Sequence, residues 1–282
     1  MFTKLCLRCV AAITGAKTIH LEKDEYQRLG LDCVRHVYDL LLSEDWKLIK
    51  KTKECDTVSS LEDSRLGKVY KLRCHVKYPA KALANALLYD VADIPKWNPT
   101  VLESIKLKIF NDRSDITYHV SASHVGGLIK SRDFVNLRSS CLIEDGKLSN
   151  ESLILNSEEQ DRLRIFCANN VIRNESENTL RAIKEHPRSF GRRVWIAAAC
   201  SVERNELPTN SKYIRGHNLL SAFVMHEVEE DPNECIFEWI MCIDLKSSLP
   251  GYVVDKGFTT AMIDFAKYLR NYITVLRHKH CT

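Results

Sequence analysis

The sequence lacks any apolar run that could cross a membrane. Among its longest apolar stretches is VWIAAAC at residues 194–200, whereas a transmembrane helix needs about 20 consecutive apolar residues. A strong charge of either sign is also missing, because 41 basic and 37 acidic residues leave a net charge of only +4. A membrane-spanning protein and an electrostatic nucleic-acid binder are therefore both disfavoured.

The cysteines lack the spacing of a disulfide framework. There are eleven of them, an odd number scattered along the chain, which favours a reducing compartment. Cys6 and Cys9 form a single CLRC without a partner pair, and His278, His280 and Cys281 belong to a short basic tail at 278–282. Neither pattern predicts a metal site, and no cofactor is expected.

Catalytic motifs are missing as well. The chain has no glycine-rich phosphate loop, no GxSxG and no HExxH, the motifs that mark nucleotide, hydrolase and zinc-protease sites. His119 and His124 lie near the expected interior but in no nucleophile context. This favours a binding protein over an enzyme, although an enzyme that uses His119 and Arg138 in a cavity stays open as a competing hypothesis.

Residues 1–24 form an N-terminal lead with no acidic residue before Glu22. Its apolar residues fall near helical spacing, as in an amphipathic, acid-poor mitochondrial presequence. A short helix or a disordered lead fits the same pattern, so both interpretations stay open.

What the sequence does contain is periodicity of two kinds. Apolar residues at helical spacing predict a helix at the start of the main domain, and alternation predicts antiparallel strands after it. The last segment has apolar residues at steps of three and four and predicts the strongest helix. The expected helices are 25–50, 79–94 and 252–277, and the expected strands include 67–78, 101–111, 115–123 and 131–138, with three more between 192 and 245.

A polar stretch at 141–191 lacks this periodicity of apolar residues. It is rich in Glu, Asn, Ser and Arg, a composition that predicts a long, largely flexible insertion. The remaining elements predict an α+β fold, with a curved antiparallel sheet and a long C-terminal helix laid across it. One helix cannot fill so wide a sheet, so an internal apolar cavity is expected.

Five motifs in this order resemble one known family. WNPTV (97–101), TYHVSASHVGGLIKSRDFVNLR (117–138), YIRGHN (213–218), FEWIMCIDLKSSLP (237–250) and DFAKYLRNYI (264–273) are similar to the START lipid-transfer domain. They most resemble its sterol-binding branch, which includes the steroidogenic acute regulatory protein, a late-endosomal relative, and insect sterol and carotenoid binders. The resemblance spans 25–277 and implies the helix-grip fold.

The resemblance also implies a set of cavity residues. Arg138 matches an arginine that points into the cavity and pairs with an acid of the neighbouring strand, and that acid falls at His119 here. A neutral histidine cannot cancel the charge of an arginine, so another acid, ordered water or the ligand must do so. Arg132, beside Asp133, is expected to be structural or exposed. The other expected ligand-binding residues are Trp97, Asn98, Leu207, Phe258, Met262 and Phe265.

We therefore expect an intracellular carrier of cholesterol or a related sterol, working as a monomer that touches membrane surfaces transiently. The resemblance implies a cytoplasmic protein, peripheral on membranes, with the mitochondrial or endosomal surface as its place of work. Two alternatives remain open: a carotenoid carrier with the same cavity, and a ligand-regulated interaction module in which 141–191 recruits a partner.

Overall fold

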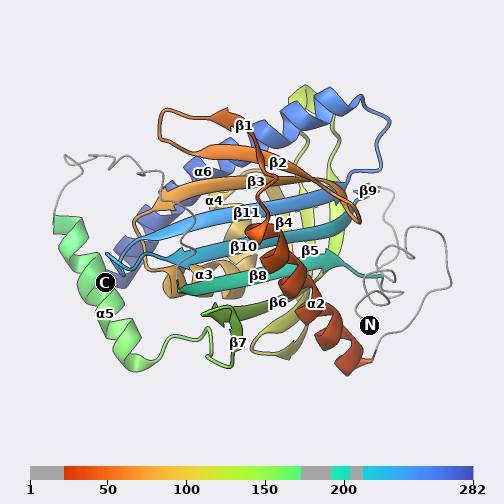
Figure 1. The fold of residues 1–282 in the computed structure, drawn as a ribbon. Coiled ribbons are helices and arrows are strands. Elements are labelled where there is room, and N and C mark those ends of the chain that lie inside the picture. Colours follow the sequence, from red (N-terminus) through yellow and green to blue (C-terminus); the bar gives the residue numbers. More distant parts are fainter. Residues whose placement is uncertain (1–21, 173–191, 204–211, 282) are drawn as a thin grey trace.

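The computed structural model describes residues 22–172, 192–203 and 212–281. Its centre is an 11-stranded sheet with the main order β1-β2-β3-β11-β10-β8-β6-β5-β4, in which β7 and β9 both pair with β6 (Figure 1). All pairs are antiparallel except β6 with β9. This is the predicted α+β architecture.

The strands are β1 (Lys47–Lys51), β2 (Thr57–Asp63), β3 (Gly67–Val76), β4 (Val101–Asn111), β5 (Ser114–Ser121), β6 (Arg132–Glu144), β7 (Lys147–Ser149), β8 (Arg193–Ser201), β9 (Ile214–Arg215), β10 (His217–Glu227) and β11 (Cys235–Asp244). The helices are α2 (Lys23–Leu42), α3 (Ala80–Tyr89), α4 (Ile94–Trp97), α5 (Ser157–Ile172) and α6 (Gly251–Cys281), with short 3-10 turns at Val91–Asp93 and Val125–Gly127. Of the helices in these described ranges, none is both long and apolar enough to span a membrane.

The predicted first helix, 25–50, is wrong only over its last residues, 43–50. Helix α2 ends at Leu42, and the chain then turns into β1 and β2. Strand β1 has the sequence KLIKK and every residue of it is exposed. A strand with no buried face shows no alternation, which is why its sequence gave no strand signal.

The predicted flexible insertion at 141–191 is also wrong over its described part. Residues 141–144 complete β6, residues 147–149 form β7, and α5 occupies Ser157–Ile172. Leu163 and Cys167 of α5 lie in the main core, and Lys81 of α3 binds Glu159 at 2.7 Å. This segment is therefore built into the domain up to Ile172, and residues 173–191 lie outside the described residues.

The sheet has two different faces. The outer face packs on α2, which crosses β6 and β8 (Figure 1). The crossing is close at Gly30, where an added Cβ would stand 2.6 Å from the Cβ of Ser139 on β6. Only a residue without a side chain allows this approach.

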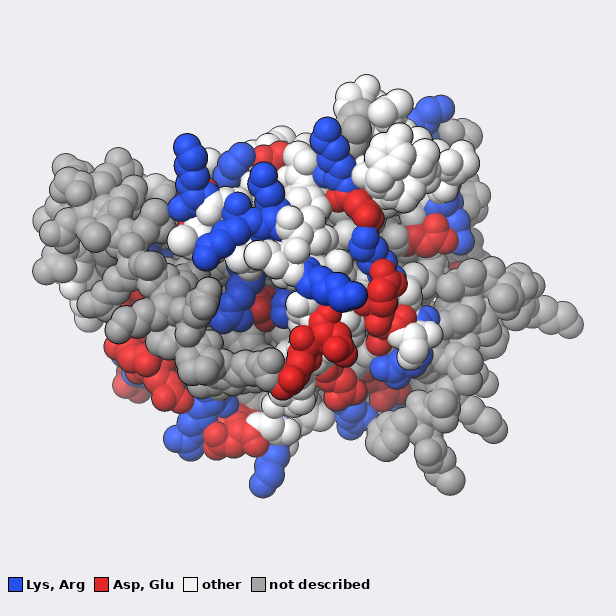
Figure 2. Space-filling model, turned by 45° about the horizontal axis from the view of Figure 1, so that its top comes forward, with Lys and Arg blue, Asp and Glu red and all other residues white. Residues whose placement is uncertain are grey.

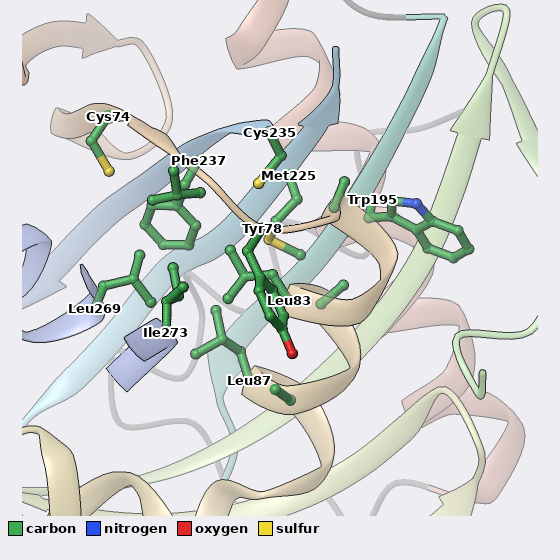
Figure 3. Packing of buried hydrophobic residues seen from close by; sticks show 14 of the residues in the cluster. Cys74, Tyr78, Leu83, Leu87, Trp195, Met225, Cys235, Phe237, Leu269 and Ile273 are labelled. Carbon is green, nitrogen blue, oxygen red and sulfur yellow. The ribbon is translucent and has the colours of Figure 1, made fainter. Parts of the chain in front are cut away.

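The inner face packs on α3 and α6. Figure 3 shows Leu83 and Leu87 of α3 and Leu269 and Ile273 of α6 gathered in the same core as Phe237 of the sheet. These five side chains are at most 4% exposed. The C-terminal half of α6 is therefore firmly packed in this core. This agrees with the apolar face of the predicted helix 252–277.

Candidate functional site

The inner face of the central strands is not filled by side chains. On β8 the outward residues Ile196, Ala198 and Cys200 are each 1% exposed, whereas the inward residues Ala197 and Ala199 are part-exposed. Strand β8 has a bonded neighbour on both sides, so this accessibility cannot come from a sheet edge. The inward residues of β8 therefore keep accessible surface on the inner face of the sheet.

Strand β10 repeats the pattern. Its outward residues Leu220, Ala222 and Val224 are at most 3% exposed, while the inward Ser221 and Phe223 are part-exposed. The N-terminal half of α6 matches this, because Val254 and Phe258 are only part-buried. Accessible apolar surface is therefore present on the inner face of β8 and β10 and on the first turns of α6, whereas the C-terminal half of α6 is packed.

Aromatic rings form a cluster between α6 and the inner face of the sheet. Phe265 of α6 lies 4.8 Å from the ring of Trp239, 5.4 Å from Phe223 and 5.8 Å from both Phe237 and Trp97, measured between centroids. Phe258 meets Tyr70 edge-on, and Met262 is fully buried beside them. The structure thus gathers Trp97, Phe258, Met262 and Phe265, four of the residues expected from the sequence.

The polar end of the space contains an arginine–aspartate pair. Arg138 donates from Nε to Oδ1 of Asp115 at 2.7 Å and from Nη2 to Oδ2 at 2.5 Å, and a further Nη2 bond goes to the carbonyl of Leu88 at 2.8 Å. The two side chains are 11% and 8% exposed. A two-point pair of this geometry cancels the charge of the arginine.

This pair corrects the acid position expected from the sequence. In the register of β5 and β6, Arg138 lies opposite Asp115, whereas His119 lies opposite Phe134. Asp115 and His119 share the inner face because they are four residues apart on one strand. The acid that balances Arg138 is therefore Asp115, and the prediction that placed this acid position at His119 is wrong.

His119 keeps a different role at the same face. Its Nε2 lies 2.8 Å from Oγ1 of Thr117, and burial, together with the nearby positive charge of Arg138, lowers its pKa to about 3. The imidazole is thus neutral at physiological pH and offers one donor and one acceptor. Its side chain is nevertheless part-exposed, as expected for a group that borders an internal space.

Arg132 is not a surface residue paired with Asp133. It is 3% exposed and donates from Nε to the carbonyl of Leu245 at 3.0 Å and to the carbonyl of Lys130. Asp133 binds Arg215 instead, at 3.1 and 2.8 Å. Of the two interpretations left open for Arg132, structural or exposed, the structure supports the structural one.

Asn98 and Leu207 complete the expected set. Asn98 is 3% exposed and accepts bonds from the backbone nitrogen and hydroxyl of Thr100, at 3.0 and 2.7 Å. Its described bonds therefore hold the turn between α4 and β4. Leu207 lies outside the described residues.

Polar contacts hold α6 against the rest of the domain, and the sequence analysis did not predict them. Near its start, Asp255 binds Lys68 at 2.6 Å and accepts from the hydroxyl of Tyr70. Further along, Arg270 donates to Asp56 at 2.9 Å. Lys68, Tyr70 and Asp56 lie far from α6 in the sequence. Their contacts with α6 can be recognised only once the position of the helix against β2 and β3 is known.

Acidification is expected to weaken the fold through His119. Its pKa of about 3 lies below the ordinary 6.5, so between those values the unfolded chain binds a proton that the folded protein does not. Stability from this group is present above pH 6.5 and is lost as the pH falls towards 3. In urea unfolding, His119→Gln should therefore lose less stability than the parent between pH 7 and pH 5.

The matched control for this experiment is Val275→Ala, which replaces a non-titrating residue on the exposed side of α6. It should lose as much stability as the parent over the same pH range. An equal loss in His119→Gln and the parent would contradict the assignment of a neutral His119.

Comparison with known proteins identifies the family of this chain. A family model of the START domain matches residues 34–161 and 166–279. The chain belongs to the START domain family. The sequence resemblance is thereby confirmed, and the matched residues include most of the segment first interpreted as an insertion.

Individual relatives match most of this chain at low sequence identity. Steroidogenic acute regulatory protein of Xenopus laevis is 24% identical over 259 residues, covering 92% of this chain and 74% of that protein. The mitochondrial steroidogenic acute regulatory protein of Danio rerio is 22% identical over 258 residues, covering 91% and 74%.

Solved START structures show the same fold. Human StAR-related lipid transfer protein 5 superposes with a TM-score of 0.66 at 16% identity, covering 89% of this chain and 97% of that one. Human STARD10 gives a TM-score of 0.58 at 17% identity, covering 92% and 82%. The helix-grip fold is confirmed by this similarity.

Proposed function

We propose that this START protein binds a lipid and transfers it between membranes, with a sterol as the cargo. One observation carries the proposal: an accessible inner face with an aromatic wall lies under the N-terminal half of α6. A rigid apolar ligand placed there would be shielded from water, which contributes about 25 cal/mol per Å2 of apolar surface. The steroidogenic names of the relatives favour a sterol within this class.

The polar end of the space favours an uncharged head group. Arg138 is already neutralised by Asp115, so an acidic ligand would find no unpaired arginine charge. Among the described residues, the bonds of Arg138 use Nε and Nη2, and its Nη1 stays available as a donor. Together with the neutral His119, this suits a hydroxyl group, which both donates and accepts.

The same groups argue against catalysis. A histidine with a pKa of about 3 is a weak base near neutral pH, where a general base works best with a pKa close to the pH. Asp115 is held by Arg138, and Lys106 also lies 3.6 Å from it. We therefore assign the site to binding and not to a chemical step.

Entry of the lipid would require the N-terminal half of α6 to move. Before Met262 and Phe265, that half is held by the contact of Asp255 with Lys68, both more than a third exposed, and exposed ion pairs contribute little. The C-terminal half is held by buried apolar residues and by Arg270, which binds the buried Asp56. We propose that α6 opens from its N-terminal end.

A basic surface lies where such a carrier would touch a membrane. Lys47, Lys50 and Lys51 are exposed on β1, as are Leu48 and Ile49 between them. Figure 2, with the β1 side turned forward, shows lysine and arginine side chains gathered there. Each basic residue near an anionic bilayer contributes about 1 kcal/mol, so this edge suits transient contact. The names of the fish and mammalian relatives make the mitochondrial surface the first membrane to test.

The proposal is tested with a fluorescent sterol and liposomes. We expect saturable binding of one sterol per chain and faster transfer between liposomes, whereas the absence of both would overturn the proposal. The carotenoid alternative has no support from the relatives, and bound carotenoid would appear as visible absorption of the purified protein.

A further inference from the structure

A pocket of about 140 Å3 lies at one end of the sheet, between the turn that joins β4 to β5 and the C-terminal end of α3. The residues that line it are Leu88, Tyr89, Lys106, Ile109, Asn111, Asp112, Arg113, Ser114, Asp115 and Ile154. Ile154 comes from the segment between β7 and α5, so three parts of the chain meet here. Ile109 and Ile154 are 66% and 54% exposed, and the pocket therefore opens to solvent.

This pocket is separate from the aromatic cluster under α6. Among the described residues that line it, none belongs to that cluster. Arg138 bonds to two of the lining residues, the carboxylate of Asp115 and the carbonyl of Leu88, without lining the pocket itself. The Arg138–Asp115 pair is thus part of the wall of the pocket.

Lys106 gives the pocket a cation that is only partly compensated. Its side chain is 21% exposed, and its ammonium lies 3.6 Å from Oδ2 of Asp115 and 5.0 Å from the ring centroid of Tyr89. Asp115 is already held at two points by Arg138, and 3.6 Å is longer than an ordinary hydrogen bond. Burial lowers the pKa of Lys106 below its ordinary value, as expected for an ammonium that lacks close partners.

Arg113 supplies a second group of donors. Its Nη2 donates to the backbone carbonyl of Glu151 at 3.3 Å and to that of Asn150. To the described residues, its Nε and Nη1 make no bond. Asp112, the acid beside it, is exposed, so water screens its charge. The pocket therefore has cationic donors to spare, while the more buried of its two acids, Asp115, is already bound.

The other side of the pocket is apolar. Leu88, Ile109, Ile154 and the ring of Tyr89 supply hydrocarbon surface. A cavity of about 150 Å3 holds one benzene molecule, so this pocket has room for one ring or a short chain. Donors on one side and hydrocarbon on the other suit a small amphipathic anion.

We propose that this pocket binds a small apolar carboxylate, such as an aromatic or short-chain acid. The carboxylate accepts hydrogen bonds from Lys106 and Arg113, and the hydrocarbon lies against Ile109 and Ile154. This site lies outside the proposed lipid-binding site and does not rest on the proposed function.

The experiment titrates the protein, with its isoleucine and methionine methyl groups labelled for NMR, with sodium benzoate. Benzoate should shift the methyl signals of Ile109 and Ile154 in a saturable way and leave that of Ile49, on β1, unchanged. Lys106→Met keeps the apolar stem but removes the charge, so it should weaken benzoate binding about 10-fold, the loss of one charge-assisted hydrogen bond. Benzamide, the neutral analogue, should bind equally to the parent and to Lys106→Met.

The matched control is Lys108→Met, on the same strand but outside the lining of the pocket. It should bind benzoate as the parent does. The proposal would be overturned by unshifted Ile109 and Ile154 signals, by a shift of the buried Met262 in their place, or by a Lys106→Met variant that binds benzoate as tightly as the parent. None of these outcomes bears on sterol binding, which is measured separately.

Discussion

Replacing Arg138 with leucine is expected to destabilise the protein by about 3–5 kcal/mol, because it leaves the buried carboxylate of Asp115 without its two-point partner. Asp115 is 8% exposed, and of the basic residues that the structure describes it would retain Lys106 alone, at 3.6 Å. Urea unfolding at pH 7 measures this loss. A fluorescent sterol measures the second expected effect, a weaker fit of the head group.

The paired control is the double variant Arg138→Met with Asp115→Leu. Replacing both partners of a buried ion pair by apolar residues is often neutral or stabilising, so the double variant should be more stable than either single variant. It should still lose sterol affinity, because the guanidinium donor of Arg138 is gone from that end. A double variant that is as unstable as the sum of the single ones would show that the two residues do not act as a pair.

Replacing Phe265 with alanine is expected to cost about 3–5 kcal/mol, as for other buried aromatic residues. Phe265 is 3% exposed and contacts four aromatic rings from α4, β10 and β11. Its loss removes the main contact between α6 and the wall of the inner space. Thermal or urea unfolding measures the loss of stability, and sterol release from the folded fraction should become faster.

The matched control lies on the same helix. Val275 is 60% exposed, so Val275→Ala should change stability by less than about 0.5 kcal/mol. If Phe265→Ala were as mild as Val275→Ala, Phe265 would not hold α6 to the sheet.

Much of the fold could be predicted because its periodic segments have one buried face. The strand at 67–78 alternates between buried and part-exposed residues in β3, and α6 buries Met262, Phe265 and Leu269 at helical steps. Such patterns follow from geometry within one element. Strand β1 and helix α5 were not predicted because β1 has no buried face and α5 buries only a few residues among polar ones.

The site could be predicted only in part, because the register of neighbouring strands decides which of its side chains pair with each other. The sequence identified Arg138 as an inward-facing arginine that needs an acid, and left open that another acid supplies it. Asp115 was available as an inward-facing residue four positions before His119. Choosing between them requires knowing that Arg138 lies opposite Asp115, which only the paired strands reveal.

The central claim is that the inner space holds a neutral sterol-type lipid. Extraction of the lipid that copurifies with the chain from eukaryotic cells, followed by mass spectrometry, tests it most directly. We predict about one sterol per protein molecule in the parent and a clear loss in the Arg138→Met, Asp115→Leu double variant. Recovery of only phospholipid or fatty acid, at the same level in both proteins, would contradict the claim.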